Sequence, residues 1–198
     1  DITYWLLGLK TREQVTAEAP NFAPQTRTTD YAWFPGAGLM ASETVEPDVP
    51  TLKRLTEYGY DAFGNRGLTR VSGAGIATRE TQRLYDTTGR FVVKNINALG
   101  HFETMSVDAG TGNIVQHTGP NGFVTHWTYD GFGRKLTENR PDGTSTTIGY
   151  SVCDAGCPAN AVMRVSTAVS GGETKWVYLD RLGREIQSAR TGFNGDWI

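Results

Sequence analysis

The sequence lacks a hydrophobic run long enough to cross a bilayer, because its longest apolar stretch near the start, Tyr4–Leu9, is far shorter than the ~20 residues of a spanning helix. Residues 1–20 also lack the basic start and apolar centre of a secretion signal. Basic residues are not in excess, since the formal net charge is −2, which disfavours nucleic acid as a partner. We therefore expect neither nucleic-acid binding nor membrane insertion by this segment.

Residues that commonly carry catalysis are also scarce. There are three histidines, at positions 101, 117 and 126, and no Gly-x-Ser-x-Gly, Walker, His-Glu-x-x-His or paired Cys-x-x-Cys motif. The stretch Asp108–Asn113 shares some features with a calcium loop but lacks its later ligands. A carboxylate pair supplied by two neighbouring turns is the remaining catalytic alternative. The sequence predicts no enzyme, no cofactor and no metal site.

Cysteine is limited to Cys153 and Cys157, separated by three residues. The pair is compatible with a small disulfide loop or with two unpaired thiols. A zinc site would need about four ligands, and no histidine lies near in the sequence.

Glycine, in contrast, is abundant, and much of it belongs to one repeated turn of Asp or Asn, two variable residues and Gly. Asp or Asn at the start of a type I turn accepts a hydrogen bond from the backbone two residues later, and Gly at the end adopts a positive φ without strain. This combination is typical of a hairpin with a G1 bulge. The turn residues that we assign are Tyr60, Asp61, Gly64, Tyr85, Asp86, Gly89, Asn97, Gly100, Tyr129, Asp130, Gly133, Arg134, Asp180, Gly183 and Arg184.

The turn glycines recur at intervals of 10 to 12 residues from Gly89 to Gly143. Such a short, constant period indicates a repeat architecture. The intervening runs, such as Phe123–Tyr129, are rich in Thr, Val and aromatic residues and alternate as strands do. We predict an all-β fold, a repetitive antiparallel β-hairpin ribbon with a curved sheet.

We divide the chain into an entry segment, residues 1–56, and a repeat sheet, residues 57–198, with an irregular insertion near 151–171. In the entry segment we expect one strand around Trp5 and another over Arg12–Glu18. Because the pattern is already under way at both ends, we expect a fragment of a much larger chain.

The turns at 60–65, 85–90, 129–134 and 179–184 resemble those of the YD-repeat, or Rhs-repeat, family. The resemblance implies a β-ribbon that spirals into a hollow shell (a cocoon), as in bacterial polymorphic and Tc toxins, and it extends distantly to the teneurins. It implies a structural, non-catalytic segment that encapsulates a toxin or effector for delivery from a secreted or cell-surface bacterial protein. Its partners would be the remainder of the shell and the enclosed C-terminal effector.

Three further expectations concern self-cleavage, an alternative binding function and self-association. The sequence lacks the Asp-Pro-x-Gly junction that closes many Rhs cores, so we expect neither the self-cleavage aspartates nor the toxin within it. A carbohydrate- or protein-binding surface module is the alternative function, with Trp127, Tyr129, Trp176 and Tyr178 as its contact residues. Open sheet edges are also expected to promote self-association.

Overall fold

The computed structural model describes residues 2–192, and it is built almost entirely of β-strands. One 3-10 helix, η1 (Ile2–Tyr4), precedes 15 strands. The strands are β1 (Arg12–Ala17), β2 (Gln25–Trp33), β3 (Met40–Val45), β4 (Arg54–Tyr60), β5 (Arg66–Gly73), β6 (Ile76–Tyr85), β7 (Val92–Ile96), β8 (Phe102–Val107), β9 (Ile114–Thr118), β10 (Val124–Tyr129), β11 (Lys135–Asn139), β12 (Ser145–Val152), β13 (Met163–Val169), β14 (Thr174–Leu179) and β15 (Glu185–Arg190).

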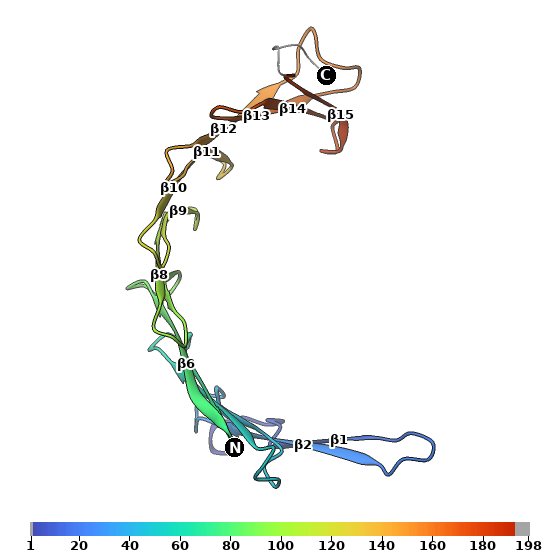
Figure 1. The fold of residues 1–198 in the computed structure, drawn as a ribbon, viewed down its shortest axis with the longest axis vertical. Helices are drawn as coiled ribbons and strands as arrows, with labels where there is room; N and C mark the ends of the chain where they lie inside the picture. Colours follow the sequence, from blue (N-terminus) through green and yellow to red (C-terminus); the bar gives the residue numbers. More distant parts are fainter. Residues whose placement is uncertain (1, 193–198) are drawn as a thin grey trace. The chain divides into compact units, whose positions relative to one another are not determined.

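The order of the strands in the sheet is their order in the chain (Figure 1). The described pairings join successive strands and are antiparallel, so these strands form a series of hairpins. The chain divides into two compact units, Asp1–Glu103 and Thr104–Ile198. The predicted all-β fold and the antiparallel hairpin ribbon are confirmed. The division into an entry segment and a repeat sheet stays a prediction.

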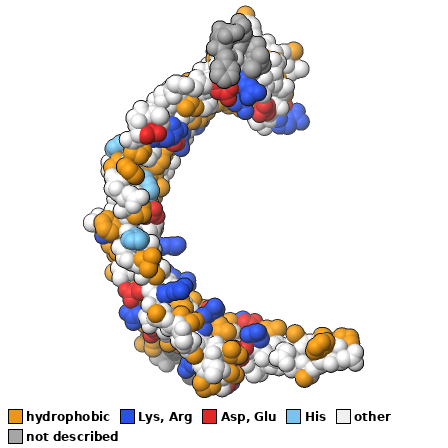
Figure 2. Space-filling model, in the orientation of Figure 1, with side chains coloured by type: hydrophobic (Ala, Val, Ile, Leu, Met, Phe, Trp, Pro, Cys, Tyr) orange, Lys and Arg blue, Asp and Glu red, His pale blue; other side chains and the backbone are white. Residues whose placement is uncertain are grey.

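The described strands form a single layer, and no hydrophobic side chain among the described residues is buried. The buried side chains are polar: Thr28, Glu46 and Thr146. In Figure 2, hydrophobic side chains are scattered over the visible face among polar and charged ones. Stability within each unit therefore depends on strand hydrogen bonds and on contacts between side chains of adjacent strands.

The N-terminal segment differs from the prediction, because the run around Trp5 is not a strand. It consists of η1 followed by a turn in which Trp5 has a φ of 55°. The ring of Tyr4 lies against Gly36, and the side chain of Leu6 lies against Gly38. The apolar run thus packs on the turn between β2 and β3 and does not pair as a strand. The second expected strand is confirmed, with β1 spanning Arg12–Ala17.

Of the interruption expected near residues 151–171, only residues 153–162 form a loop, and it lies between β12 and β13, because Met163–Val169 is the strand β13. Cys153 donates its backbone N–H to Val162 O at 2.9 Å, which closes the base of the loop. Cys153 and Cys157 form a disulfide within it. Despite the longer loop, β12 and β13 pair in a continuous antiparallel register, as the strands of the shorter hairpins do.

In the part of the chain that the structure describes, no helix has both the length and the apolar character needed to cross a membrane.

Candidate functional site: the repeated turns

The turn Asp130–Arg134 shows how the motif closes a hairpin between β10 and β11. Asp130 Oδ1 accepts backbone N–H groups of Phe132 and Arg134, each at 2.9 Å. Asp130 Oδ2 accepts the guanidinium Nε of Arg134 at 2.7 Å. Gly133 has a φ of 76°, and its N–H donates to Asp130 O at 2.9 Å. The carboxylate therefore fixes the whole turn, and the glycine allows the left-handed step at its end.

The same geometry recurs in other copies. Asp61 accepts backbone N–H groups of Phe63 and Asn65, both at 2.9 Å. Asp180 accepts those of Leu182 and Arg184 at 2.8 and 3.0 Å. The looser copy behaves alike although it has an amide, since Asn97 Oδ1 accepts Leu99 N–H at 2.9 Å and His101 N–H at 3.1 Å. One local solution thus serves several hairpins.

The copy at Asp86 is one residue longer. Its backbone N–H donates to Phe91 O at 2.8 Å, and its carboxylate accepts N–H groups of Arg90 at 2.7 Å and Phe91 at 3.1 Å. Thr88 Oγ1 donates to the second oxygen at 2.6 Å. An extra hydroxyl contact thus accompanies the longer turn.

The turn carboxylates are more acidic than usual. Partial burial alone would raise the pKa of Asp130, but the hydrogen bonds from the Arg134 backbone and guanidinium, and then from Phe132, lower it below its ordinary value. The pKa of Asp180 is likewise lowered, first by the backbone N–H of Arg184 and then by its side chain. These oxygens remain ionised and engaged in turn hydrogen bonds at neutral pH.

The tyrosine that precedes the aspartate connects its turn to an earlier strand. Tyr60 donates its hydroxyl to Met40 O at 2.9 Å, and Tyr129 donates to Ile114 O at 2.8 Å. In both cases the acceptor is the first residue of the preceding odd-numbered strand, β3 or β9. Both tyrosines also lie at an irregularity in the register, which fits the predicted bulge.

A second set of contacts joins one turn to the next turn on the same edge. Asn65 Nδ2 donates to Gly89 O at 2.6 Å, and the ring of Phe63 lies directly over Gly89. In the other unit, Asn113 Nδ2 donates to Gly133 O at 3.3 Å. Turns that follow consecutive even-numbered strands are therefore linked laterally, in each unit, by an asparagine placed just after the turn glycine.

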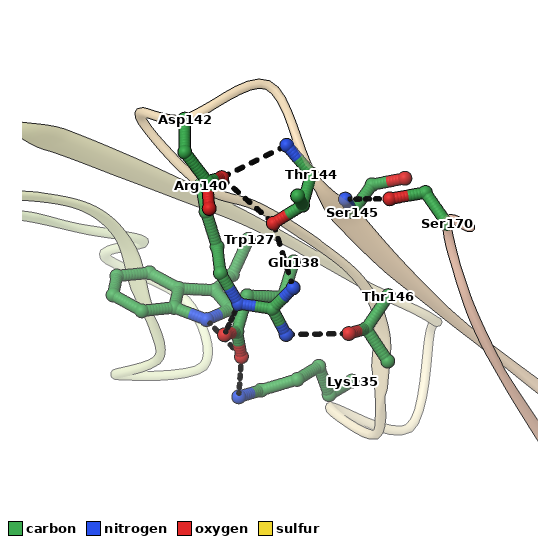
Figure 3. Close-up of polar contacts among 9 residues, drawn as sticks. All are labelled: Trp127, Lys135, Glu138, Arg140, Asp142, Thr144, Ser145, Thr146 and Ser170. Carbon is green, nitrogen blue, oxygen red and sulfur yellow. Dashed lines mark hydrogen bonds and ion pairs between the residues drawn. The ribbon is translucent and has the colours of Figure 1, made fainter. Parts of the chain in front are cut away.

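A polar network lies at the end of β11 (Figure 3). Glu138 Oε2 accepts Trp127 Nε1 at 3.0 Å and Lys135 Nζ at 3.2 Å, and its Oε1 accepts Arg140 Nε at 3.1 Å. Arg140 also donates to the hydroxyl of Thr146 at 2.5 Å. The indole N–H of Trp127, followed by the Lys135 contact, lowers the pKa of Glu138 despite partial burial. The network binds β10, β11 and β12 to one another.

Other residues that the sequence suggested for binding or metal coordination make hydrogen bonds within the fold. Trp127 and Tyr129, which the alternative binding function needs on the surface, are half-buried and hydrogen-bonded to Glu138 and Ile114. Among residues 2–192, no group of three or more His, Cys, Asp or Glu side chains is arranged to hold a metal ion. Asp108 directs its carboxylate to the backbone of Gly110 and Thr111, at 3.1 and 2.8 Å.

Sequence reasoning missed the linking residues Asn65 and Asn113 and the network around Glu138. The asparagines carry a detectable signal, because each occupies the position directly after a turn glycine. The network carries none, since Trp127, Glu138 and Thr146 come from three strands and meet only through their register.

Comparisons with known proteins agree with this architecture. The family model described as RHS Repeat matches residues 110–145, which span β9, β10 and β11 and the turns between them. A search of curated proteins finds no match.

Among solved structures, the chain is similar to one described as the crystal structure of TcdB2-TccC3-TEV, with a TM-score of 0.58 and 14% identity over 89% of this chain. It also matches a Tc holotoxin pore of Photorhabdus luminescens with a mutation in TccC3, with a TM-score of 0.48 and 12% identity over 94% of this chain. The chain spans about a tenth of the length of each, since it covers 10% and 11% of them. The family-model match supports the resemblance drawn from the sequence over residues 110–145, which contain an RHS repeat, and the first of these solved structures shows that the fold of the chain is similar to part of TcdB2-TccC3-TEV.

Proposed function

We propose that the chain is a structural, non-catalytic segment of the wall of an Rhs/YD-repeat shell, which encapsulates a toxin or effector region for delivery. The observation that carries this proposal is the combination of a single-layer sheet, in which no hydrophobic side chain of the described residues is buried, and turns that are linked from hairpin to hairpin. Such a sheet divides space into two sides and can be extended by further hairpins of the same kind.

The fold similarity to TcdB2-TccC3-TEV supports the proposal, because that structure contains a comparable arrangement of strands within a much longer chain. The partners proposed on this basis are the remainder of the shell and an enclosed C-terminal effector. The setting proposed is a secreted or cell-surface bacterial protein. In this function the Tyr-Asp turns connect successive strands of the wall, and their carboxylates accept the backbone hydrogen bonds that hold each turn.

The outer strands β1 and β15 each have one described strand neighbour. Their unpaired edges are suited to pairing with the remainder of the shell, or with a second copy when no such partner is present. We expect the 198-residue chain to self-associate at high concentration. Light scattering that shows only monomer at every concentration would contradict the edge-pairing part of the proposal.

The experiment that tests the shell is limited proteolysis of the native protein at its full length. Deletion of β10 and β11 with their turn, residues 124–139, removes one hairpin from the wall while preserving the antiparallel order. We expect the intact protein to protect another segment of its own chain from protease, and the deletion to expose that segment. The matched control is Arg181→Gln, an exposed change at a turn tip. No protected segment in the intact protein would refute the function.

A further inference from the structure

One face of β4, β5 and β6 in the first unit carries a cluster of arginines. Thr56 pairs with Val71, and Val71 pairs with Arg79, so these three side chains share a face. Strand alternation places Arg54 beside Thr56, and Arg83 beside Arg79, on that same face. Figure 2 shows Lys and Arg side chains gathered where Figure 1 labels β6.

Arg66, at the start of β5, belongs to the same cluster. Its guanidinium lies 4.0 Å from the ring centre of Tyr58, which shares the face because Tyr58 pairs with Thr69 and Thr69 pairs with Thr81. We call Arg54, Arg66, Arg79 and Arg83 the arginine face. All four side chains are exposed.

The arginine face has no balancing acidic residue on its own strands. The register and strand alternation place Glu57 and Glu80 on the opposite face, where Arg70 Nη2 lies 2.8 Å from Glu80 Oε2. Within residues 2–192, none of the four arginines has an ion pair. On the flanking strands this face carries Glu43 of β3, whose Oε2 lies 3.5 Å from the Tyr58 hydroxyl, and Glu103 of β8. Glu103 Oε1 accepts Nδ2 of Asn95, the residue that pairs with Arg83, at 3.0 Å. Within β4, β5 and β6, the arginines that have no ion pair therefore lie on one side of the sheet.

Two aromatic residues of β4 on this face, Tyr58 and Tyr60, already have contacts over their rings. Tyr58 is covered by Arg66, and the ring of Tyr60 packs edge-on against Phe34 with centroids 6.0 Å apart. Tyr60 also donates its hydroxyl to Met40 O. Single-stranded nucleic acids bind mainly by combining phosphate contacts with base stacking on open aromatic rings. Together with the net charge of −2, this arrangement disfavours a nucleic acid.

We propose that the arginine face binds an extended acidic polypeptide segment. Arg79 and Arg83 are four residues apart on one strand, a separation of ~13 Å, and β4 lies two strand spacings, ~10 Å, from β6. An extended chain places alternate side chains on one side every ~6.6 Å, so acidic residues at every second position reach guanidinium groups along β6. Guanidinium groups are planar, permanently charged and suited to two-point binding of carboxylates.

The surface is tested with the 198-residue chain and a fluorescent 12-residue peptide that has Glu at every second position. Fluorescence anisotropy at low ionic strength measures its affinity, and a peptide with Lys in place of Glu and a 12-nucleotide oligothymidine are measured in parallel. Arg83→Gln is expected to weaken binding of the Glu peptide about two- to fivefold, and combined Arg79→Gln and Arg83→Gln about fivefold to twentyfold. Added salt is expected to weaken it further.

The matched control is Arg181→Gln, which removes the same charge from an exposed turn tip in the other unit. It is expected to change the affinity less than twofold. Equal losses for Arg83→Gln and Arg181→Gln, equal binding of the Lys peptide, no binding of the Glu peptide, or tighter binding of oligothymidine would each overturn the proposal. The test is independent of the shell function, because it measures binding in solution and not protection of an enclosed segment.

Discussion

The contact between Phe63 and Gly89 allows the lateral linkage of turns to be measured. Gly64 and Gly89 both occupy the final position of a Tyr-Asp turn, with φ values of 84° and 69°. A Cβ atom at Gly64 would meet nothing within 4 Å, whereas a Cβ at Gly89 would clash with the ring of Phe63. The two glycines therefore impose the same backbone requirement but differ in what lies over them.

The expected costs follow from this difference. Gly64→Ala places a Cβ in the left-handed region and is expected to destabilise the first unit by about 1–2 kcal/mol. Gly89→Ala carries that cost and an overpacking cost of about 1–3 kcal/mol, because the aromatic ring must move. Truncation of the ring by Phe63→Ala removes the second cost. In that background, Gly89→Ala is expected to cost no more than Gly64→Ala does.

The measurement is urea unfolding followed by far-ultraviolet circular dichroism, with hydrogen exchange mass spectrometry to locate the change in β4–β7. Gly131→Ala is the matched control, since Gly131 lies in a Tyr-Asp turn but has open space around it and no positive φ. It is expected to be neutral or slightly stabilising. Equal losses for Gly64→Ala and Gly89→Ala would refute the packing argument, and a loss at Gly131 equal to that at Gly64 would refute the backbone argument.

Three further predictions concern the other parts of the turns. Tyr60→Phe removes the hydroxyl bond to Met40 O and is expected to cost about 0.5–1.5 kcal/mol in urea unfolding; no loss would show that the bond is energetically silent. The pKa of Asp130 is below its ordinary 3.8, so the ionised carboxylate stabilises the fold above that pH, and this contribution is lost as the pH falls through the folded pKa. Asp130→Asn should therefore reduce the fall in stability at acid pH, and an unchanged fall would contradict this. Cys153→Ser opens a short loop and is expected to lower thermal stability by up to about 2 kcal/mol, with hydrogen exchange rising only near the β12–β13 loop; a loss spread over the whole unit would contradict a local role.

Much of the fold follows from the sequence because the hairpin signals are local. An Asp or Asn and a Gly three residues later determine a turn through contacts within five residues, as the bonds of Asp61 and Asp130 show. The strand runs between turns follow from the same spacing. The prediction around Trp5 was wrong for the opposite reason: an apolar run has no local signal that separates a strand from a segment packed on a neighbouring turn, here the one containing Gly36.

Only the tertiary structure decided which residues meet across strands. The sequence names Tyr60 and Tyr129, but the acceptors of their hydroxyl groups lie 20 and 15 residues earlier and are brought close by the pairing of adjacent strands, β3 with β4 and β9 with β10. The register likewise decides that Arg54, Arg79 and Arg83 share a face on which β4, β5 and β6 carry no acidic residue, while Arg70 and Glu80 pair on the other face. Turns are determined by residues close in the sequence, so they can be predicted from the sequence alone. Which side chains share a face depends on the strand register, because successive side chains point to opposite faces and a shift of one residue would exchange them.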